Sequence, residues 1–412
     1  MGAKDVSSYG CWGAPVAVQP NDFACGNDAY ADGNGATAIG SDATAQGEWA
    51  TAVGRQSNAN GKGAIAVGRE AIAKGERSIS VGAMSGKDSK GSRNIFIGAE
   101  SGQNTEGDNN TAVGDLSGTN VFGDENTAFG SNSGNDIGTF PDPQNQADQG
   151  TKGSRNSVLG VNSGNHVTGN ENSAFGYNSG NWVSGDGNIA FGRGAGNGSS
   201  EIPLSANHTV AIGTGSLATG NHGIAIGTQS RARGGNSMAL GHGTATNGPG
   251  GVAIGADSQG NGAQSLRENH FVLGTQNHTY SAPGITSDES RSFQQGPLQV
   301  LTTDAAGNLA SDGGLLFEEL SKMGGGVAIA MALENPDLVG NERFGLAGNV
   351  AFWEDNVALG FTAMGVLGHN FLGTGERWAL SGGVGFTVQE ESYGGRKSQS
   401  SVGGRAGLQV TW

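Results

Sequence analysis

A five-residue unit that ends in glycine recurs through two thirds of the chain and constrains the fold more than any other feature. The unit has the pattern small–x–small–apolar–Gly, as in ATAIG at 36–40 and ATAVG at 50–54. Its closing glycines follow a strict 14-residue step over 26–82, a 16-residue step through most of the middle, and a 14-residue step again over 213–255. Repeats at a fixed period of this kind indicate a solenoid.

The length of the period sets the shape of each repeat. Two short strands joined by tight turns fit into 14 to 16 residues, and together they make one coil of a parallel β-solenoid. Residues alternate along the strand, so Thr37 and Ile39 face one way while Ala36 and Ala38 face the other. We expect the small residues to allow close approach of another backbone, and homo-oligomerisation to bury their face. The large residues are expected to stack as a buried apolar ladder, which includes Ile39, Val53, Val67, Val81, Val113, Phe129, Phe175, Phe191, Ile212, Ile226, Leu240 and Ile254.

The 16-residue repeats carry extra Asn and Asp beside glycine. GDNN at 107–110, GDEN at 123–126, GNEN at 169–172 and GDGN at 185–188 all lie in this part of the chain. Repeat β-rolls that bind calcium place acidic residues in their turns, but they use a GGxGxD spacing that these sequences lack. We therefore interpret the Asn and Asp residues as turn caps, whose short side chains hydrogen-bond the backbone.

Two insertions break the regular step, one containing 139–150 and the other containing 194–207. We expect both to project from the side of the solenoid as loops, and such loops on a rigid scaffold are common binding sites. Insertions that are tolerated without a ligand are the alternative. Trp49, like Trp182, lies off the apolar ladder and is expected to be exposed. The candidate contact residues of the head are Phe140, Asp142, Trp182 and Ile202.

Cysteine and histidine offer few candidate sites. Cys11 and Cys25 could form one disulfide in an oxidising compartment. Because Cys25 takes the ladder position of Ile39, we favour a buried small hydrophobic residue instead. His208 and His222 both lie five residues before a closing glycine, so they can stack in adjacent coils. Around a threefold axis they would form rings of imidazoles, although we favour isolated turn histidines.

Composition and motifs exclude several classes of function. A net charge of −15 disfavours binding to the phosphates of nucleic acid, and no apolar run of about 18 residues is available for a transmembrane helix. No P-loop, HExxH or CxxC motif occurs, and a GxGxxG-like match carries no weight among 78 glycines. The N-terminus lacks the regions of a signal peptide, so we expect a processed or truncated chain, or another route of export. We predict no enzyme function, no cofactor and no metal site.

The pattern changes at about residue 315. LLFEELSKM at 315–323 has the apolar spacing of one or two coiled-coil turns, and small apolar residues continue from there to Pro336. Four segments of about ten residues then alternate large apolar side chains with small or polar ones, a pattern typical of outer-membrane β-barrels. A small soluble sandwich is the alternative. The residues predicted to face lipid are Phe344, Leu346, Val357, Leu359, Phe361, Trp378, Leu380, Val384, Phe386, Leu408, Val410 and Trp412.

Four strands cannot close a barrel by themselves, because about eight is the smallest number that encloses a filled interior. Three chains that contribute four strands each would supply twelve. The small inward residues would then leave room for helices in the lumen. A soluble sandwich would need a second layer over its large apolar face, and the four strands provide none.

Both ends of the chain resemble the YadA-like trimeric autotransporter adhesins. The repeats, for example ATAVGRQSNANGKGAIAVG at 50–68, are similar to the β-roll head of that family. Residues 324–412, from GGVAIAMALE to the terminal Trp412, are similar to its membrane anchor. The resemblance implies a homotrimer whose twelve-stranded barrel supports passage of the head to the cell surface. It also implies that the outer-membrane assembly machinery recognises the terminal aromatic residue. The long coiled-coil stalk usual in the family is reduced here to about 315–323.

The predicted fold is all-β, with a left-handed parallel β-roll head, a short coiled-coil helix, and four strands per chain in a twelve-stranded trimeric outer-membrane barrel. We divide the chain into five parts. They are an N-terminal segment at 1–22, the head at 23–274, a connector at 275–314, a helical stalk and lumen helix at 315–335, and the anchor strands at 336–412.

The predicted function is that of a bacterial surface adhesin, anchored in the outer membrane with its head exposed on the cell. Its expected partners are two further copies of the chain, outer-membrane lipid, the assembly machinery, and a host matrix protein or surface receptor. A structural or autoaggregation spike without a specific ligand is one alternative. An ice-binding solenoid is another, because Thr37, Thr51 and Thr111 align, but Ile65 and Ile79 interrupt them and their alternation places them with the buried face.

Overall fold

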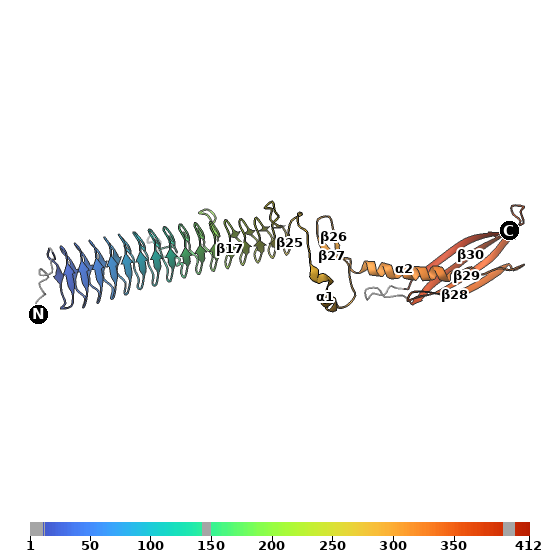
Figure 1. Ribbon diagram of the computed structural model, residues 1–412, viewed down its shortest axis with the longest axis horizontal. Helices are drawn as coiled ribbons and strands as arrows, with labels where there is room; N and C mark the ends of the chain where they lie inside the picture. Colours follow the sequence, from blue (N-terminus) through green and yellow to red (C-terminus); the bar gives the residue numbers. More distant parts are fainter. Residues whose placement is uncertain (1–10, 12, 142–149, 390–399) are drawn as a thin grey trace. The chain divides into compact units, whose positions relative to one another are not determined.

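The computed structural model describes residues 11, 13–141, 150–389 and 400–412. The chain divides into two compact units, Met1–Thr279 and Tyr280–Trp412. The first unit is a parallel β-solenoid whose coils stack one on another from the N-terminal end (Figure 1). The second unit ends in four antiparallel strands. The predicted all-β class and the parallel solenoid are therefore confirmed.

One side of the solenoid is a 16-stranded parallel sheet with one strand from each coil. Its strands pair in register, so Thr37 lies beside Thr51 and Ala38 lies beside Ala52. The recurring unit before each closing glycine forms these strands, and the period of the sequence is thus the period of the coil. The strands are β2 (Phe23–Cys25), β4 (Thr37–Ile39), β6 (Thr51–Val53), β8 (Ile65–Val67), β10 (Ile79–Val81), β11 (Ile95–Ile97), β12 (Thr111–Val113), β13 (Thr127–Phe129), β14 (Ser157–Leu159), β15 (Ser173–Phe175), β16 (Ile189–Phe191), β17 (Val210–Ile212), β19 (Ile224–Ile226), β21 (Met238–Leu240), β23 (Val252–Ile254) and β25 (Phe271–Leu273).

Two-residue strands form the other side of the coil in the 14-residue repeats. The 16-residue coils have isolated parallel bridges there instead, such as Lys90 with Glu106 and Val167 with Val183. The short strands of the N-terminal coils are β1 (Val16–Ala17), β3 (Tyr30–Ala31), β5 (Thr44–Ala45), β7 (Asn58–Ala59) and β9 (Ile72–Ala73). Those of the later coils are β18 (Leu217–Ala218), β20 (Arg231–Ala232), β22 (Ala245–Thr246) and β24 (Gln264–Ser265).

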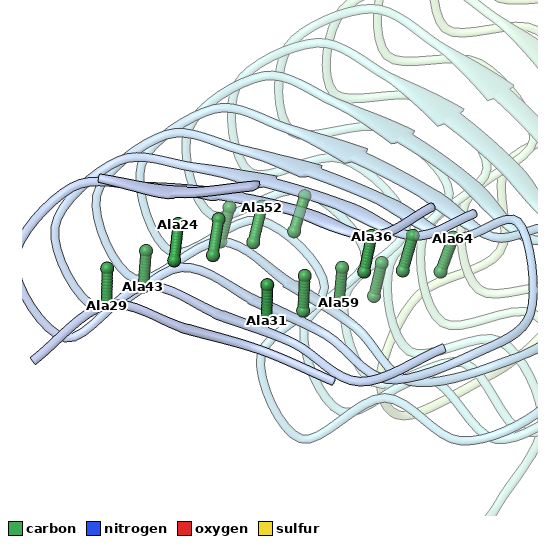
Figure 2. Packing of buried hydrophobic residues seen from close by; sticks show 14 residues of the cluster. Ala24, Ala29, Ala31, Ala36, Ala43, Ala52, Ala59 and Ala64 are labelled. Carbon is green, nitrogen blue, oxygen red and sulfur yellow. The ribbon is translucent and has the colours of Figure 1, made fainter. Parts of the chain in front are cut away.

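Small side chains fill the lumen of the 14-residue coils. Ala38, Ala52 and Ala66 are fully buried, and Figure 2 shows alanines of this cluster lying together inside the N-terminal coils. Ile39 points outward and is 38% exposed. The predicted division into two faces is correct, but the prediction that the large apolar face is buried is wrong for the single chain. The two short strands of a coil lie so close together that little more than a methyl group fits between them.

The closing glycines allow the coils to stack closely. Gly40 has a φ of 130°, a region that side chains disfavour. A Cβ atom on Gly40 would lie 2.6 Å from the carbonyl oxygen of Gly54 in the next coil. The glycine that ends each unit is therefore required by both backbone conformation and contact.

The 16-residue coils have a wider interior. Phe96 is almost fully buried there, and a separate row of apolar residues lies inside the opposite corner of the coil. Two more residues per coil make space for these larger side chains. The inner row consists of Val121, Ile137, Val167, Val183, Leu204 and Ala206.

The second unit begins with small elements and then forms a helix and a sheet. The segment predicted as an irregular connector contains η2 (Pro283–Thr286), α1 (Asp288–Ser292) and a hairpin of β26 (Leu301–Thr303) and β27 (Leu309–Ser311). A continuous helix, α2 (Leu315–Ala332), follows. Four strands then pair in sequence order, β28 (Phe344–Trp353), β29 (Asn356–His369), β30 (Arg377–Gln389) and β31 (Val402–Thr411).

Helix α2 lies on the small-residue face of this sheet. Ala328, Ala332 and Ile329 of the helix pack against Ala351 and Ala358 of the strands. Alanine and glycine at these sheet positions let the helix approach closely. Among the residues that the structure describes, no helix is long and apolar enough to cross a membrane.

Candidate functional site

Two rows of outward side chains run along the 16-stranded sheet. The residue before each closing glycine forms the first row, which is most exposed in the middle coils, where Phe191 is 57% exposed. The residue two positions earlier forms a second row of Thr, Ser, Ile and Val, so Thr37 lies on the outer face beside Ile39. We call these two rows the outer strip. The outer strip continues across all 16 strands of the sheet. A long continuous row of exposed apolar residues is typical of a surface that contacts another molecule.

Buried asparagines hold the 16-residue coils in register. The Nδ2 atom of Asn126 donates to the carbonyl oxygen of Gly153 at 2.8 Å, and its Oδ1 atom accepts the backbone N–H of Asn156 at 3.0 Å. Equivalent bonds link Ser78, Asn94, Asn110, Asn126, Asn156, Asn172, Asn188 and Thr209 in order. These asparagines act as caps, as interpreted from the sequence. Among the described residues, no group of three or more His, Cys, Asp or Glu is placed to hold a metal ion.

One corner of the 16-residue coils carries a second, exposed ladder. The Nδ2 atom of Asn104 donates to Asn120 at 3.0 Å, and that of Asn120 donates to Asp136 at 2.9 Å. The carboxylate of Asp136 lies 3.2 Å from Nδ1 of His166. The imidazole then stacks on the indole of Trp182 with ring centroids 3.9 Å apart and an angle of 18°. The column of hydrogen-bonded amide side chains thus continues as the two stacked rings of His166 and Trp182.

Both insertions leave the solenoid next to this corner. The first begins with an antiparallel bridge between Thr139 and Thr151, directly after Ile137. The second ends where Leu204 pairs with Val183. Since Ile137, Val167, Val183 and Leu204 are successive bridge partners, the insertions lie three coil steps apart. At about 4.8 Å per step, this spacing is about 14 Å.

The structure gives different positions to the four predicted contact residues of the head. Ile202 is 77% exposed on the second insertion. Phe140 is half-buried, with its ring centroid 5.3 Å from that of Phe122. Trp182 is half-buried against His166, and Asp142 lies outside the described residues.

Sequence reasoning missed His166 and Asp136, although both belong to the same corner as Trp182. The first insertion separates them by 30 residues, so the regular 16-residue step does not align them. Counting each repeat from its Ser-Gly pair would have revealed the column, because Asp136, His166 and Trp182 all lie two residues after that glycine.

A cationic group lies beside the first insertion. The Lys152 ammonium is 3.1 Å from Asp124 and 5.8 Å from the centroid of the Phe122 ring. Burial raises the pKa of Asp124, but the backbone N–H of Asp108 and the Lys152 ammonium outweigh it and hold this pKa below its ordinary value. Lys152 and Asp124 therefore largely neutralise each other.

A second tryptophan, Trp49, lies at a different corner, in a 14-residue coil. Trp49 is 60% exposed and packs over Gly35 of the preceding coil. The Lys62 ammonium lies 5.0 Å from its ring centroid and 2.7 Å from Glu48. The expected exposure of Trp49 is confirmed.

The cysteine and histidine predictions have opposite outcomes. Cys11 and Cys25 form a disulfide across 14 residues, so the favoured interpretation of Cys25 as an unpaired hydrophobic residue is wrong. Both cysteines occupy the same ladder position in successive repeats, which brings them together at the first coils. His208 and His222 stack with ring centroids 5.3 Å apart, as expected for equivalent positions in adjacent coils.

The strand residues predicted to face lipid alternate with those that contact α2, and they therefore lie on the opposite face of the sheet. Most are exposed in the single chain, whereas Val357, Leu359, Trp378 and Val410 are half-buried. Trp412 is 83% exposed, and its indole N–H donates to the hydroxyl of Thr374 at 3.3 Å.

Polar side chains from three strands hold the C-terminal end of α2. Asn349 of β28 donates to the carbonyl oxygen of Ala332 at 3.3 Å, and Thr362 of β29 donates to that of Glu334 at 2.5 Å. Arg405 of β31 donates to the carbonyl oxygen of Leu333 at 2.5 Å. The last carbonyls of a helix have no partner within it, so the sheet supplies the missing donors.

Part of the chain matches a known family model. The 14-residue coils match the YadA head domain repeat at 21–43, 31–57, 45–71, 59–85, 205–230 and 232–258. The chain therefore carries YadA head domain repeats, and the resemblance drawn from the sequence is confirmed. The repeats and the solenoid together define a protein like the trimeric autotransporter adhesins. None of the curated proteins compared with the chain matches it.

Proposed function

We propose that this chain is a homotrimeric surface adhesin of the autotransporter type. The observation that carries the proposal is the outer strip on a head built from YadA head domain repeats. A contiguous row of exposed large apolar residues, which includes Phe129 and Phe191, is typical of a surface that another molecule covers. Strips from three copies that meet around a common axis would cover one another along the whole head.

The four-stranded sheet supports the proposed anchor. Strands β28 and β31 each pair with one neighbour in the sheet, and such edges call for a further partner. Three copies placed edge to edge would form a closed barrel of twelve strands. Phe344, Leu346, Val384 and the other large residues would then face lipid, and the α2 helices would fill the lumen.

Export and surface display follow from the same proposal. The disulfide between Cys11 and Cys25 supports an oxidising environment for the head, because such bonds persist outside the cytosol. The outer-membrane assembly machinery would recognise the C-terminal strand with Trp412. A rigid head that presents many equivalent surfaces suits multivalent attachment. No enzymatic step is proposed.

The test is cell attachment by the displayed full chain. Cells that display it should bind a matrix-coated or host-cell surface, and a variant without 23–274 should lose binding while its anchor stays in the membrane. The full chain should also migrate as a heat-resistant oligomer. A chain that sediments as a monomer would contradict the proposal. Clumping of the cells without attachment to any surface would favour a structural spike.

A further inference from the structure

The corner that carries Trp182 places a large aromatic side chain where the backbone favours small polar residues. Trp182 has a φ of 57°, and the residues before it in the column, Asn104, Asn120 and Asp136, have values of 51°, 56° and 54°. Asparagine, aspartate and glycine adopt this left-handed conformation most readily. The indole lies outside the coil, so it contributes nothing to the lumen. Its position is therefore suited to a contact with another molecule.

Groups of mixed chemistry surround the indole. His166 covers one ring face, and Asp136 binds the imidazole at 3.2 Å while it also accepts from Asn120 at 2.9 Å. Thr168 and Ser184 belong to the same two coils, two residues after His166 and Trp182, and Ser184 is exposed. The corner thus combines an apolar ring surface with nearby hydroxyl groups, and the Asp136 carboxylate, two coil steps from Trp182, holds the imidazole in place.

The stems of the two insertions stand on either side of the corner. These stems lie three coil steps apart, about 14 Å, and Ile202 stands exposed on the second insertion. This width admits one or two sugar rings side by side. A stable protein interface needs about 800 Å² per partner and would have to extend well beyond this width.

Other classes of ligand fit the corner poorly. A peptide that adds a strand needs a free sheet edge, and here Val167 and Val183 are already paired with the coils on both sides. Charged polymers need a surface with many charges of one sign, but Lys152 is paired with Asp124, and the neutral amides of Asn104 and Asn120 precede Asp136 in the column. What remains is a neutral ligand with an apolar face and polar edges.

We propose that the corner formed by Asp136, His166, Trp182 and Ser184, with Ile202 at its side, binds neutral carbohydrate. This inference rests on the proposed adhesin function and names the ligand class of the head. The C–H face of a pyranose ring packs on the indole face that is turned away from His166, and its hydroxyls pair with the Ser184 hydroxyl. Cells that display the protein then attach through many weak sugar contacts at once.

The experiment uses cells that display the full chain and beads coated with neutral oligosaccharides of N-acetylglucosamine and N-acetyllactosamine. Wild-type cells should bind the beads, and free oligosaccharide should compete. Trp182→Asn installs the residue found at Asn104 and Asn120 in this column, so the coil should still fold. It should reduce bead binding about tenfold, the effect expected for loss of one stacking contact.

Trp49→Asn is the matched control, since it removes an exposed indole at a different corner. It should leave bead binding unchanged, and both variants should keep the heat-resistant oligomer and the protease resistance of the wild-type head. Bead binding by Trp182→Asn at the wild-type level overturns the inference, as does a wild type that binds none of the beads. If wild-type cells still attach to a matrix-coated surface in that case, the adhesin function stands and only the ligand class is wrong. If they attach to nothing, the function itself fails.

Discussion

The side-chain oxygen of Asn156 accepts the backbone N–H of Asn172 in the next coil at 3.0 Å. Both residues are buried, and the Nδ2 atom of Asn156 donates in turn to the carbonyl oxygen of Gly169 at 3.0 Å. One side chain thus satisfies a donor and an acceptor of the backbone where water cannot reach them. Repetition of this pair through the wide coils holds the turn before each strand of the large sheet in register with the next coil.

Asn156→Ala should loosen the wide coils, because it leaves buried groups of Asn172 and Gly169 without partners. Each such loss costs about 1–3 kcal/mol. Hydrogen exchange of the purified full chain should accelerate around 156–188. Asn104→Ala, at the exposed corner, removes a bond that water can replace and should change exchange little. Equal effects of the two substitutions would contradict the role assigned to Asn156.

Ala52→Leu and Val53→Leu test which face of the strand lies inside the coil. Ala52 is fully buried in the lumen, whereas Val53 belongs to the outer strip. Overpacking a filled interior costs about 1–3 kcal/mol, so Ala52→Leu should expose the N-terminal coils to protease. Val53→Leu should leave the protease resistance of these coils nearly unchanged. Greater protease sensitivity of Val53→Leu than of Ala52→Leu would show that the large apolar residues lie inside the coil.

Phe191→Glu should weaken the association of the heads. A carboxylate in the outer strip would have to lose its water when three strips meet, and an unpaired buried charge costs several kcal/mol. The temperature at which the oligomer dissociates on gels should fall. Ser184→Glu adds the same charge in the same coil but outside the strip, and it should leave that temperature unchanged. No difference between the variants would argue against the strip as the interface.

Loss of the disulfide should affect only the first coils. Cross-linking a loop of about 15 residues stabilises a protein by about 3 kcal/mol in the chain-entropy treatment. Cys11→Ser should therefore increase hydrogen exchange in the coils near Cys25 and leave 205–258 as it was, because a solenoid transmits effects only to neighbours. A global fall in thermal stability would show that the first coils nucleate the whole head.

Acid should loosen the C-terminal end of the head first. The Asn261 side chain, the Asn261 backbone N–H and the Asn277 side chain hold the pKa of Asp257 well below its usual range. A depressed pKa means that the stabilisation is present above the unfolded value, about 3.9, and is lost as pH falls below it toward the folded value. Proteolysis within 255–278 should rise below about pH 4, whereas Asp257→Asn should show a smaller dependence on pH there.

The sequence predicted the coil, its period and its strands, but it did not predict the direction in which the side chains point. Alternation places Ala38 and Ile39 on opposite faces and leaves open which face is inside. Hydrophobicity favours burial of Ile39, yet the distance between the two strands of a narrow coil admits only Ala38. The isoleucine is therefore left on the outer face, 38% exposed in the single chain.

The candidate binding corner was predicted only in part. Trp182 and Ile202 stand out in the sequence because one is aromatic and off the ladder and the other lies in an insertion. His166 and Asp136 gave no such signal, since histidine and aspartate in turns are ordinary. Their importance comes from alignment across coils, which depends on where the first insertion leaves and rejoins the stack.

Each strand of the large sheet pairs only with the strands of that sheet that precede and follow it in the chain. No paired residues in the sheet are further apart along the chain than Thr127 and Ser157. A finished coil therefore presents a complete template to the coil that follows. Such local order makes folding fast and independent of residues that have yet to arrive. Under the proposed function, such a head could cross the membrane as an extended chain and then fold one coil after another on the far side.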